Sequence, residues 1–239
     1  MPRQTFLTAE WRNLVLLNYE VDPGLILSLV PRGTEIDHWN NKAFVSLVGF
    51  QFLKTRVFGL PIPFHTNFDE VNLRFYVRRE VGGELRRGVV FIREIVPRRA
   101  IAFVARTFYN ENYIALPMEH AIVTTVAGNV EATYRWQANG HWNEMCIETQ
   151  GNPELPCYQS QEQFIAEHYW GYAAQRDGGC IEYQVTHPSW RVWQSRDAVF
   201  RGEVDKLYGS EFAAVLRGSP ASAFLAEGSA ISVMRGHKL

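Results

Sequence analysis

The fold is decided by residues 67–77, which read Asn67-Phe68-Asp69-Glu70-Val71-Asn72-Leu73-Arg74-Phe75-Tyr76-Val77. From Glu70 onward polar and apolar residues alternate, as in a β-strand, where successive side chains point to opposite faces. One face carries Glu70, Asn72 and Arg74, and the other carries aliphatic and aromatic side chains. A carboxylate, an amide and a guanidinium in one row form either a solvated strand face or the floor of a polar cavity, and the pattern leaves both open.

Further strand and helix signals surround this stretch. Alternation and composition predict strands at 14–21, 43–53, 85–96, 170–174, 180–186 and 229–235, and a hairpin of 121–137 with 141–149. Capping residues and helical periodicity predict short helices at 22–30, 98–109, 160–168 and 210–217. The expected fold is therefore β-rich α+β, a mostly antiparallel, barrel-like sheet with a few short peripheral helices, in a single domain spanning residues 1–239.

An apolar loop interrupts the strands at residues 57–64, Val57-Phe58-Gly59-Leu60-Pro61-Ile62-Pro63-Phe64. Pro61 and Pro63 lack the N–H that a central strand needs. The loop either packs on the core of its own subunit or forms a subunit contact or a lid over a pocket, since exposed apolar loops usually have a use.

Composition and charge restrict the class of protein. The formal net charge of -1 gives no electrostatic reason to expect nucleic acid or an anionic membrane as a partner. No apolar leader or membrane-spanning run is recognisable, and the three cysteines, Cys146, Cys157 and Cys180, suit neither a disulfide framework nor a thiolate metal site. We therefore expect a cytoplasmic protein that binds no membrane and no nucleic acid.

Segments along nearly the whole chain resemble the uncharacterised bacterial YqjF-like family. They are Phe6-Leu7-Thr8-Ala9-Glu10-Trp11-Arg12, Asn18-Tyr19-Glu20-Val21-Asp22-Pro23, Leu29-Val30-Pro31-x-Gly33-Thr34, Val45-Ser46-Leu47-Val48-Gly49-Phe50, residues 67–77, Tyr109-Asn110-Glu111-Asn112-Tyr113, Glu167-His168-Tyr169-Trp170-Gly171-Tyr172 and Ser222-Ala223-Phe224-Leu225-Ala226-Glu227-Gly228-Ser229. That family is similar in fold to acetoacetate decarboxylase, whose barrel-like domain encloses a small polar cavity and assembles into oligomers. The resemblance thus implies a polar cavity inside the barrel and a homo-oligomer.

The resemblance to the decarboxylase extends to some functional segments and fails at one. Residues 22–31 resemble its early Asp-Pro helix, Phe68-x-Glu70 resembles its aromatic-x-Glu strand, whose glutamate lines the active site, and Ala105-Arg106 resembles part of its Gly-Arg-Glu segment. The decarboxylase then has Pro-Lys-Lys, where this chain has Asn112-Tyr113-Ile114-Ala115-Leu116-Pro117-Met118. Imine chemistry needs a primary amine, and no lysine occurs between residues 54 and 206. A Schiff-base decarboxylase is therefore not expected.

The candidate catalytic residues are Glu70, as an acid or base, and Arg106, as an anion anchor. In a closed barrel, burial would raise the pKa of Glu70, whereas contact with Arg74 or Arg106 would lower it. An ideal helix would aim Arg106 about 150° away from the apolar stripe of 98–109, so a surface or intersubunit ion pair is the alternative.

The candidate ligand-binding residues supply amide, guanidinium, phenol and imidazole groups. They are Asn72, Arg74, Tyr109, Tyr113, Tyr169 and His168. The tyrosines equally suit a buried core with one satisfied hydrogen bond, and a histidine at a helix end is often a favourable partner of the helix dipole. Histidine spacing matches no metal motif, so we expect neither a metal nor a cofactor.

Two functions, and a third structural interpretation, follow from these residues. The first is a protein that binds a small organic acid in a polar barrel cavity. The alternative is a lyase, isomerase or hydrolase that acts on a small oxo- or hydroxy-acid without an imine, with Glu70 as acid or base. The structural interpretation makes the aromatic surface and the 57–64 loop an oligomer interface.

Overall fold

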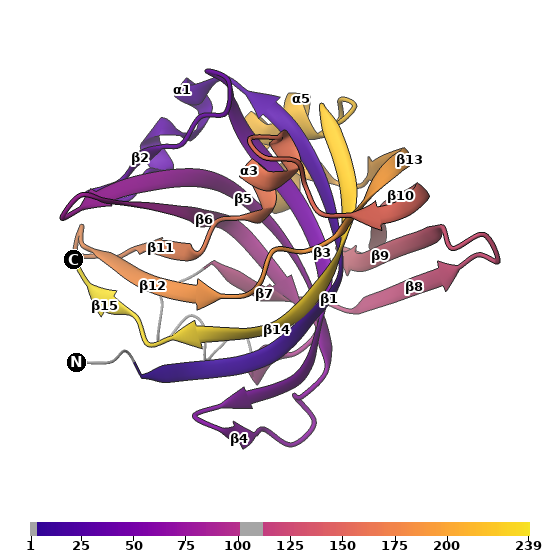
Figure 1. The fold of residues 1–239 in the computed structure, drawn as a ribbon, viewed down its shortest axis with the longest axis horizontal. Coiled ribbons are helices and arrows are strands. Elements are labelled where there is room, and N and C mark those ends of the chain that lie inside the picture. Colours follow the sequence, from indigo (N-terminus) through magenta and orange to yellow (C-terminus); the bar gives the residue numbers. More distant parts are fainter. Residues whose placement is uncertain (1–3, 101–111) are drawn as a thin grey trace.

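The structure is a computed structural model, and it describes residues 4–100 and 112–239. Strands dominate the described residues (Figure 1). In chain order they are β1 (Thr5–Val21), β2 (Glu35–Ile36), β3 (Ala43–Val57), β4 (Leu60–Pro61), β5 (Phe68–Val81), β6 (Glu84–Val96), β7 (Tyr113–Ala115), β8 (Met118–Thr124), β9 (Val130–Ala138), β10 (His141–Glu154), β11 (Trp170–Ala174), β12 (Cys180–Thr186), β13 (Val192–Arg201), β14 (Ser222–Met234) and β15 (His237–Lys238). The helical segments are α1 (Pro23–Ile26), η1 (Leu27–Leu29), α3 (Gln161–Ala166), α4 (Val204–Tyr208), η2 (Ser210–Phe212) and α5 (Ala213–Leu216).

Part of the sheet closes into a ring. Hydrogen-bonded neighbours follow the order β12, β11, β6, β5, β3, β1 and β14. Strand β12 also pairs with β14 through Val185–Val233 and Thr186–Ser232, which closes the circuit. Among the strand pairings within residues 4–100 and 112–239, only β6–β11 and β6–β7 are parallel. The predicted mostly antiparallel, barrel-like sheet with a few short helices is therefore confirmed in a ring-like form.

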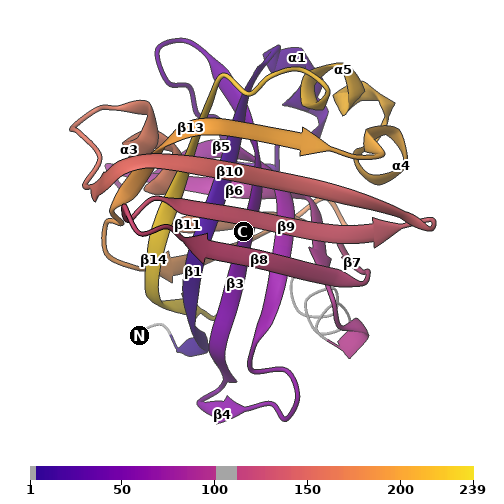
Figure 2. The same ribbon diagram turned by 90° about the vertical axis from the view of Figure 1, so that its right-hand side faces the viewer.

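A second layer crosses the outside of the ring. From β14 the sheet continues through β13, β10, β9 and β8, and these strands run across β1, β3 and β5 (Figure 2). One hydrophobic core joins the two layers, and its members include Leu17, Leu47, Leu73, Trp136 and Met145. A Cβ at Gly49 of β3 would lie 2.8 Å from both Met145 Sδ and Tyr134 Cδ2, so the glycine permits the layers to approach this closely.

A bulge in β1 changes which residues face the interior of the ring. Asn13 has a φ of 53°, and the pairing of β1 with β3 shifts between Arg12 and Val15. Trp11 before the bulge and Leu14 after it therefore both line the interior cavity described below. The alternation predicted from Leu14 onward is correct, but β1 begins nine residues earlier, at Thr5, because the bulge breaks the period of two.

Most other predicted elements are present, with the following differences. The predicted strand 121–137 is wrong as a single element, because a turn at 125–129 divides it into β8 and β9. Strand β13, helix α4 and the short strands β2, β4, β7 and β15 were not predicted from the sequence, and β14 begins at Ser222 where the prediction began at Ser229. The predicted helix 98–109 lies largely outside the described residues. Within the described ranges, no helix has both the length and the apolar character needed to cross a membrane.

Candidate functional site

The ring encloses a cavity of about 210 Å³. Its walls include residues of β1, β3, β5, β6, β7, β11, β12 and β14. Further lining residues are Ile62 and His65 before β5, Ile165, Ala166 and His168 at the end of α3, and His187 and Trp190 after β12. Segments that are far apart in sequence therefore meet around one enclosed space.

The polar row of β5 lines this cavity. Glu70, Asn72 and Arg74 all contribute to its wall. Glu70 is only 3% exposed; its Oε1 accepts a 2.9 Å hydrogen bond from Asn72 Nδ2, and its Oε2 accepts a 3.1 Å hydrogen bond from the Tyr113 hydroxyl. Burial raises the pKa of Glu70 to about 7, and the two hydrogen bonds and the charge of Arg74 limit the rise. The carboxyl group is thus poised to change protonation state near neutral pH.

Arg74 is a cavity-lining cation without a carboxylate partner among the described residues. Its Nε is buried and has no hydrogen-bond partner there, and the guanidinium carbon lies 5.7 Å from the centre of the Tyr76 ring. The same holds for the amide oxygen of Asn72, which is buried and without a partner in the described parts of the chain. A free guanidinium and a free amide oxygen on one wall can bind a polar group that the chain itself does not supply.

A second carboxylate, Glu94 on β6, lies opposite Asn72 in the strand register. Its side chain is 1% exposed and also lines the cavity. Asn72 therefore lies between two buried acidic residues, one beside it on its own strand and one across the strand pair.

His168 lines the cavity beside an ion pair between the buried Asp37 carboxylate and the half-exposed Arg87. Asp37 Oδ2 lies 3.0 Å from Arg87 Nε and 3.3 Å from His168 Nε2. Because a carboxylate only accepts, His168 Nε2 carries the proton in this arrangement, and Nδ1 keeps a lone pair that has no partner among the described residues. Burial lowers the pKa of His168, although Asp37 opposes this shift, so the ring is neutral at pH 7.

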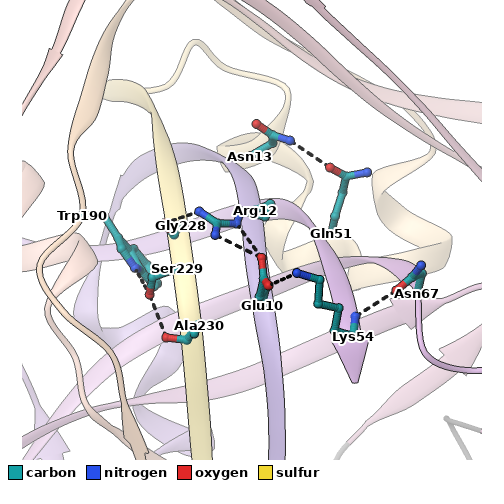
Figure 3. Close-up of polar contacts among 10 residues, drawn as sticks. All are labelled: Glu10, Arg12, Asn13, Gln51, Lys54, Asn67, Trp190, Gly228, Ser229 and Ala230. Atoms are coloured by element: carbon teal, nitrogen blue, oxygen red, sulfur yellow. Dashed lines mark hydrogen bonds and ion pairs between the residues drawn. The ribbon is translucent and has the colours of Figure 1, made fainter. Parts of the chain in front are cut away.

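Aromatic side chains form another wall of the cavity. The Trp11 ring lies 5.3 Å from Phe50, 5.7 Å from Phe52 and 6.2 Å from Trp190, measured between centroids, and His187 stacks on Trp190 at 4.0 Å. Trp190 is fixed by a 2.9 Å hydrogen bond from its Nε1 to Ser229 Oγ on β14 (Figure 3). We call Trp11, Phe50, Phe52, His187 and Trp190 the aromatic belt.

The charged neighbours of Trp11 point away from the belt. Glu10 accepts hydrogen bonds from Arg12 and Lys54 on the other face of β1 (Figure 3). The alternation of β1 thus places an ion-pair network on the outer face and an indole ring in the cavity.

The structure brings together some of the predicted site residues. Glu70, Asn72, Arg74, Tyr113 and His168 all line the cavity. Tyr169 does not; its ring lies 4.7 Å from His187, behind the cavity wall. Arg106 and Tyr109 lie outside the described residues.

Sequence reasoning missed Glu94 and the aromatic belt. Glu94 is the single acidic residue of the predicted 85–96 strand, and this was the available signal for it. The belt had no comparable signal, because its members come from β1, β3 and the connection after β12. No cluster of three or more histidine, cysteine, aspartate or glutamate side chains suited to a metal ion occurs in residues 4–100 or 112–239.

Comparisons with known proteins agree with this architecture. The sequence profile of DUF2071, described as an uncharacterized conserved protein, matches residues 8–230. The uncharacterized protein YqjF of Bacillus subtilis (strain 168) is 30% identical over 110 residues, which make up 46% of this chain and 44% of YqjF, so the match spans less than half of that relative. The predicted resemblance to the YqjF-like family is confirmed.

Solved structures share the fold at low sequence identity. An acetoacetate decarboxylase from Legionella pneumophila subsp. pneumophila str. Philadelphia 1 superposes with a TM-score of 0.68 and 11% identity, over 99% of this chain and 88% of the other. The enduracididine biosynthesis enzyme MppR, in complex with pyruvate, gives a TM-score of 0.67 and 13% identity, over 100% of this chain and 91% of the other. At these identities the likeness establishes the fold alone.

Proposed function

Because the chain belongs to the DUF2071 family of uncharacterized conserved proteins, whose description states no activity, we propose from the site itself that the ring cavity binds a small organic acid. The observation that carries this proposal is Arg74, a cavity-lining guanidinium with no carboxylate partner in the described residues. A carboxylate ligand would supply the missing partner through paired N–H···O bonds.

The energetics favour an anionic ligand over an empty cavity. An unpaired cation next to apolar walls loses hydration without gaining an ion pair, which is unfavourable. Natural proteins accept such a cost mainly at functional sites, where a ligand supplies the compensating charge. MppR, a protein with this fold, holds pyruvate, which is a carboxylic acid, and this supports a carboxylic acid as the class of ligand.

Glu70 would determine how the acid is held. With a pKa of about 7, Glu70 is protonated in a substantial fraction of molecules at neutral pH. The protonated form of Glu70 repels a bound carboxylate less than the ionised form does, and it can donate a hydrogen bond to that carboxylate. We therefore assign Arg74 as the anion anchor, and Glu70 with Asn72 as the groups that orient the ligand.

The second candidate function is an enzyme that acts on a small oxo- or hydroxy-acid without an imine intermediate. The favourable observation is again the pKa of Glu70, because an acid or base works best when its pKa lies near the working pH. No lysine occurs between residues 54 and 206, so the described strands β5, β6, β7 and β11 offer no primary amine for a Schiff base. A lyase, isomerase or hydrolase using Glu70 is the form this candidate takes.

The remaining predictions about the molecule's surroundings stay proposals. The 57–64 loop exposes Phe58, Leu60, Ile62 and Phe64, which supports a homo-oligomer contact at this loop. A cytoplasmic bacterial protein organised as one domain fits the composition and the family.

A thermal-shift screen with small carboxylic acids tests the proposal. Each acid is paired with its neutral amide, and Arg74→Met is compared with Arg78→Met, which removes a guanidinium from the same strand but breaks only an exposed ion pair with Glu35. We expect acids to raise the melting temperature of the wild type and of Arg78→Met, and to have little effect on Arg74→Met. Equal shifts with acids and amides, or an undiminished response in Arg74→Met, would reject the anion anchor.

A further inference from the structure

We propose that the acid bound by this cavity carries an aromatic ring, so that its class is the aryl-substituted carboxylic acids rather than small hydrophilic oxo-acids. This inference rests on the proposed function and goes further by naming the group that is attached to the carboxylate of the ligand. Three observations carry it: the size of the cavity, the geometry of the aromatic belt, and the position of the belt on other segments than the charged residues.

The cavity is larger than a three- or four-carbon acid requires. Space for one water corresponds to roughly 10–15 Å³ on the scale used for such cavities, and this cavity measures about 210 Å³. A small acid on Arg74 would leave most of that space to water, against walls that are largely aromatic. An apolar group on the acid would displace this water and bury apolar surface, which is favourable.

The belt has the geometry that aromatic rings adopt with one another. Trp11 meets Phe50 and Phe52 edge to face, at interplanar angles of 69° and 84°, and Phe52 stacks on Phe68 at a centroid distance of 4.7 Å. All four side chains line the cavity. An aromatic guest extends such a cluster, and one aromatic pair adds about two- to tenfold in affinity beyond the area it buries.

The aromatic belt lies on other segments than the charged groups of the cavity, although the charged strands also contribute Phe68 and Phe91 to the lining. The charged lining residues in the described ranges, Glu70, Arg74 and Glu94, are on β5 and β6, whereas the belt comes from β1, β3 and the connection after β12. A ligand that satisfies both walls has an anionic head and an aromatic body. Trp11 Nε1 is buried and has no hydrogen-bond partner among the described residues, so it offers a donor to an oxygen of the ligand on the belt side.

Calorimetric titration with four related compounds tests this inference on the full chain at neutral pH. Acetate presents the head alone, cyclohexylacetate adds an apolar ring, phenylacetate adds an aromatic ring, and phenylacetamide keeps the aromatic ring without the charge. We expect phenylacetate to bind at least about tenfold more tightly than acetate and about two- to tenfold more tightly than cyclohexylacetate. We expect phenylacetamide to bind at least about tenfold more weakly than phenylacetate.

The outcomes separate this inference from the function on which it rests. If acetate or cyclohexylacetate binds as tightly as phenylacetate, the aromatic body is wrong and the organic-acid function stands. If phenylacetamide matches phenylacetate, or if none of the four compounds binds, the anion anchor is wrong and both proposals fall.

A pair of variants locates the aromatic contact. Phe52→Leu removes a belt ring, and Phe200→Leu removes a ring that stacks on Trp136 in the second layer, away from the cavity. The preference for phenylacetate over cyclohexylacetate should fall at least about twofold in Phe52→Leu and stay unchanged in Phe200→Leu. An unchanged preference in folded Phe52→Leu would place the ring elsewhere and overturn the belt as its binding surface.

Discussion

The hydroxyl of Tyr113 on β7 donates a 3.1 Å hydrogen bond to Glu70 Oε2 on β5, although β6 lies between these two strands in the sheet. Together with Asn72, this bond holds the Glu70 carboxyl group in one position inside the ring. The contact gives Glu70 a defined orientation toward the cavity and partly offsets the effect of burial on its pKa.

Removing that hydroxyl should raise the pKa of Glu70 further. In Tyr113→Phe the ionised carboxylate loses a donor, so its pKa moves above the wild-type value of about 7. Carbon-13 NMR titration of the glutamate carboxyl carbons measures the shift. Tyr208→Phe is the control, because the buried Tyr208 hydroxyl has no hydrogen-bond partner in the described chain; a pKa of Glu70 that is the same in all three proteins would contradict the assigned role of Tyr113.

Replacing Glu70 should change how stability depends on pH. Its pKa is about 7 in the folded protein and near 4.5 when unperturbed, so the folded state binds more protons between these values and the free energy of unfolding falls as pH rises from about 4.5 to 7. Glu70→Gln removes this slope, which amounts to roughly 3 kcal/mol over the interval. Urea denaturation at pH 5, 6, 7 and 8 measures it, and parallel profiles for the wild type and the variant would show that Glu70 is not titrating in this window.

Removing the positive charge of Arg74 should not destabilise the protein without ligand. Arg74→Met replaces a partly buried guanidinium that makes no ion pair among the described residues with an apolar side chain, so we expect the free energy of unfolding to stay equal or rise by about 1–2 kcal/mol. Chemical denaturation of the apo protein checks the sign. A decrease in the free energy of unfolding of more than about 2 kcal/mol would mean that Arg74 stabilises the fold through a partner within the chain, and it would contradict its assignment as a ligand-binding group.

Asp37 should be important for stability because it is the buried partner of Arg87 and His168. Asp37→Asn removes the buried carboxylate that His168 and the half-exposed Arg87 share and should cost about 1–3 kcal/mol. Asp177→Asn breaks an exposed ion pair with Lys238 and should cost clearly less, because exposed ion pairs contribute little to stability. Denaturant titrations measure the free energy of unfolding of both variants. Similar decreases for Asp37→Asn and Asp177→Asn would contradict the greater contribution assigned to the buried Asp37 carboxylate.

Much of the fold could be predicted because helix caps and strand patterns can be recognised within a single segment of the sequence. Asp22 caps α1 by accepting a hydrogen bond from Gly24 N, and Ser160 caps α3 by accepting one from Gln163 N, as their sequence positions indicate. The hairpin of β11 and β12 has the predicted bounds. The division of 121–137 was missed, since apolar residues continue to Ala127 and only the pair Gly128-Asn129 indicates the turn.

The site could be predicted only in part, for a physical reason. Glu70, Asn72 and Arg74 share a strand, so alternation alone places them on one face. Other lining residues join them only through contacts between distant segments, and these residues are Glu94, Trp11 and Trp190. The sheet closes through the pairing of β12 with β14, and the bulge at Asn13 changes which residues of β1 face the cavity. Closure and bulges depend on contacts between distant segments, and the sequence pattern of one segment does not contain them.

The most direct test of the account is a crystal structure of the protein soaked with 4-bromophenylacetate, in which anomalous scattering locates the bromine. We predict a bromine peak inside the ring beside the aromatic belt, with the carboxylate within hydrogen-bond distance of the Arg74 guanidinium. An anomalous peak only outside the ring, or a carboxylate inside it that avoids Arg74, would contradict the proposal that this cavity is an organic-acid site.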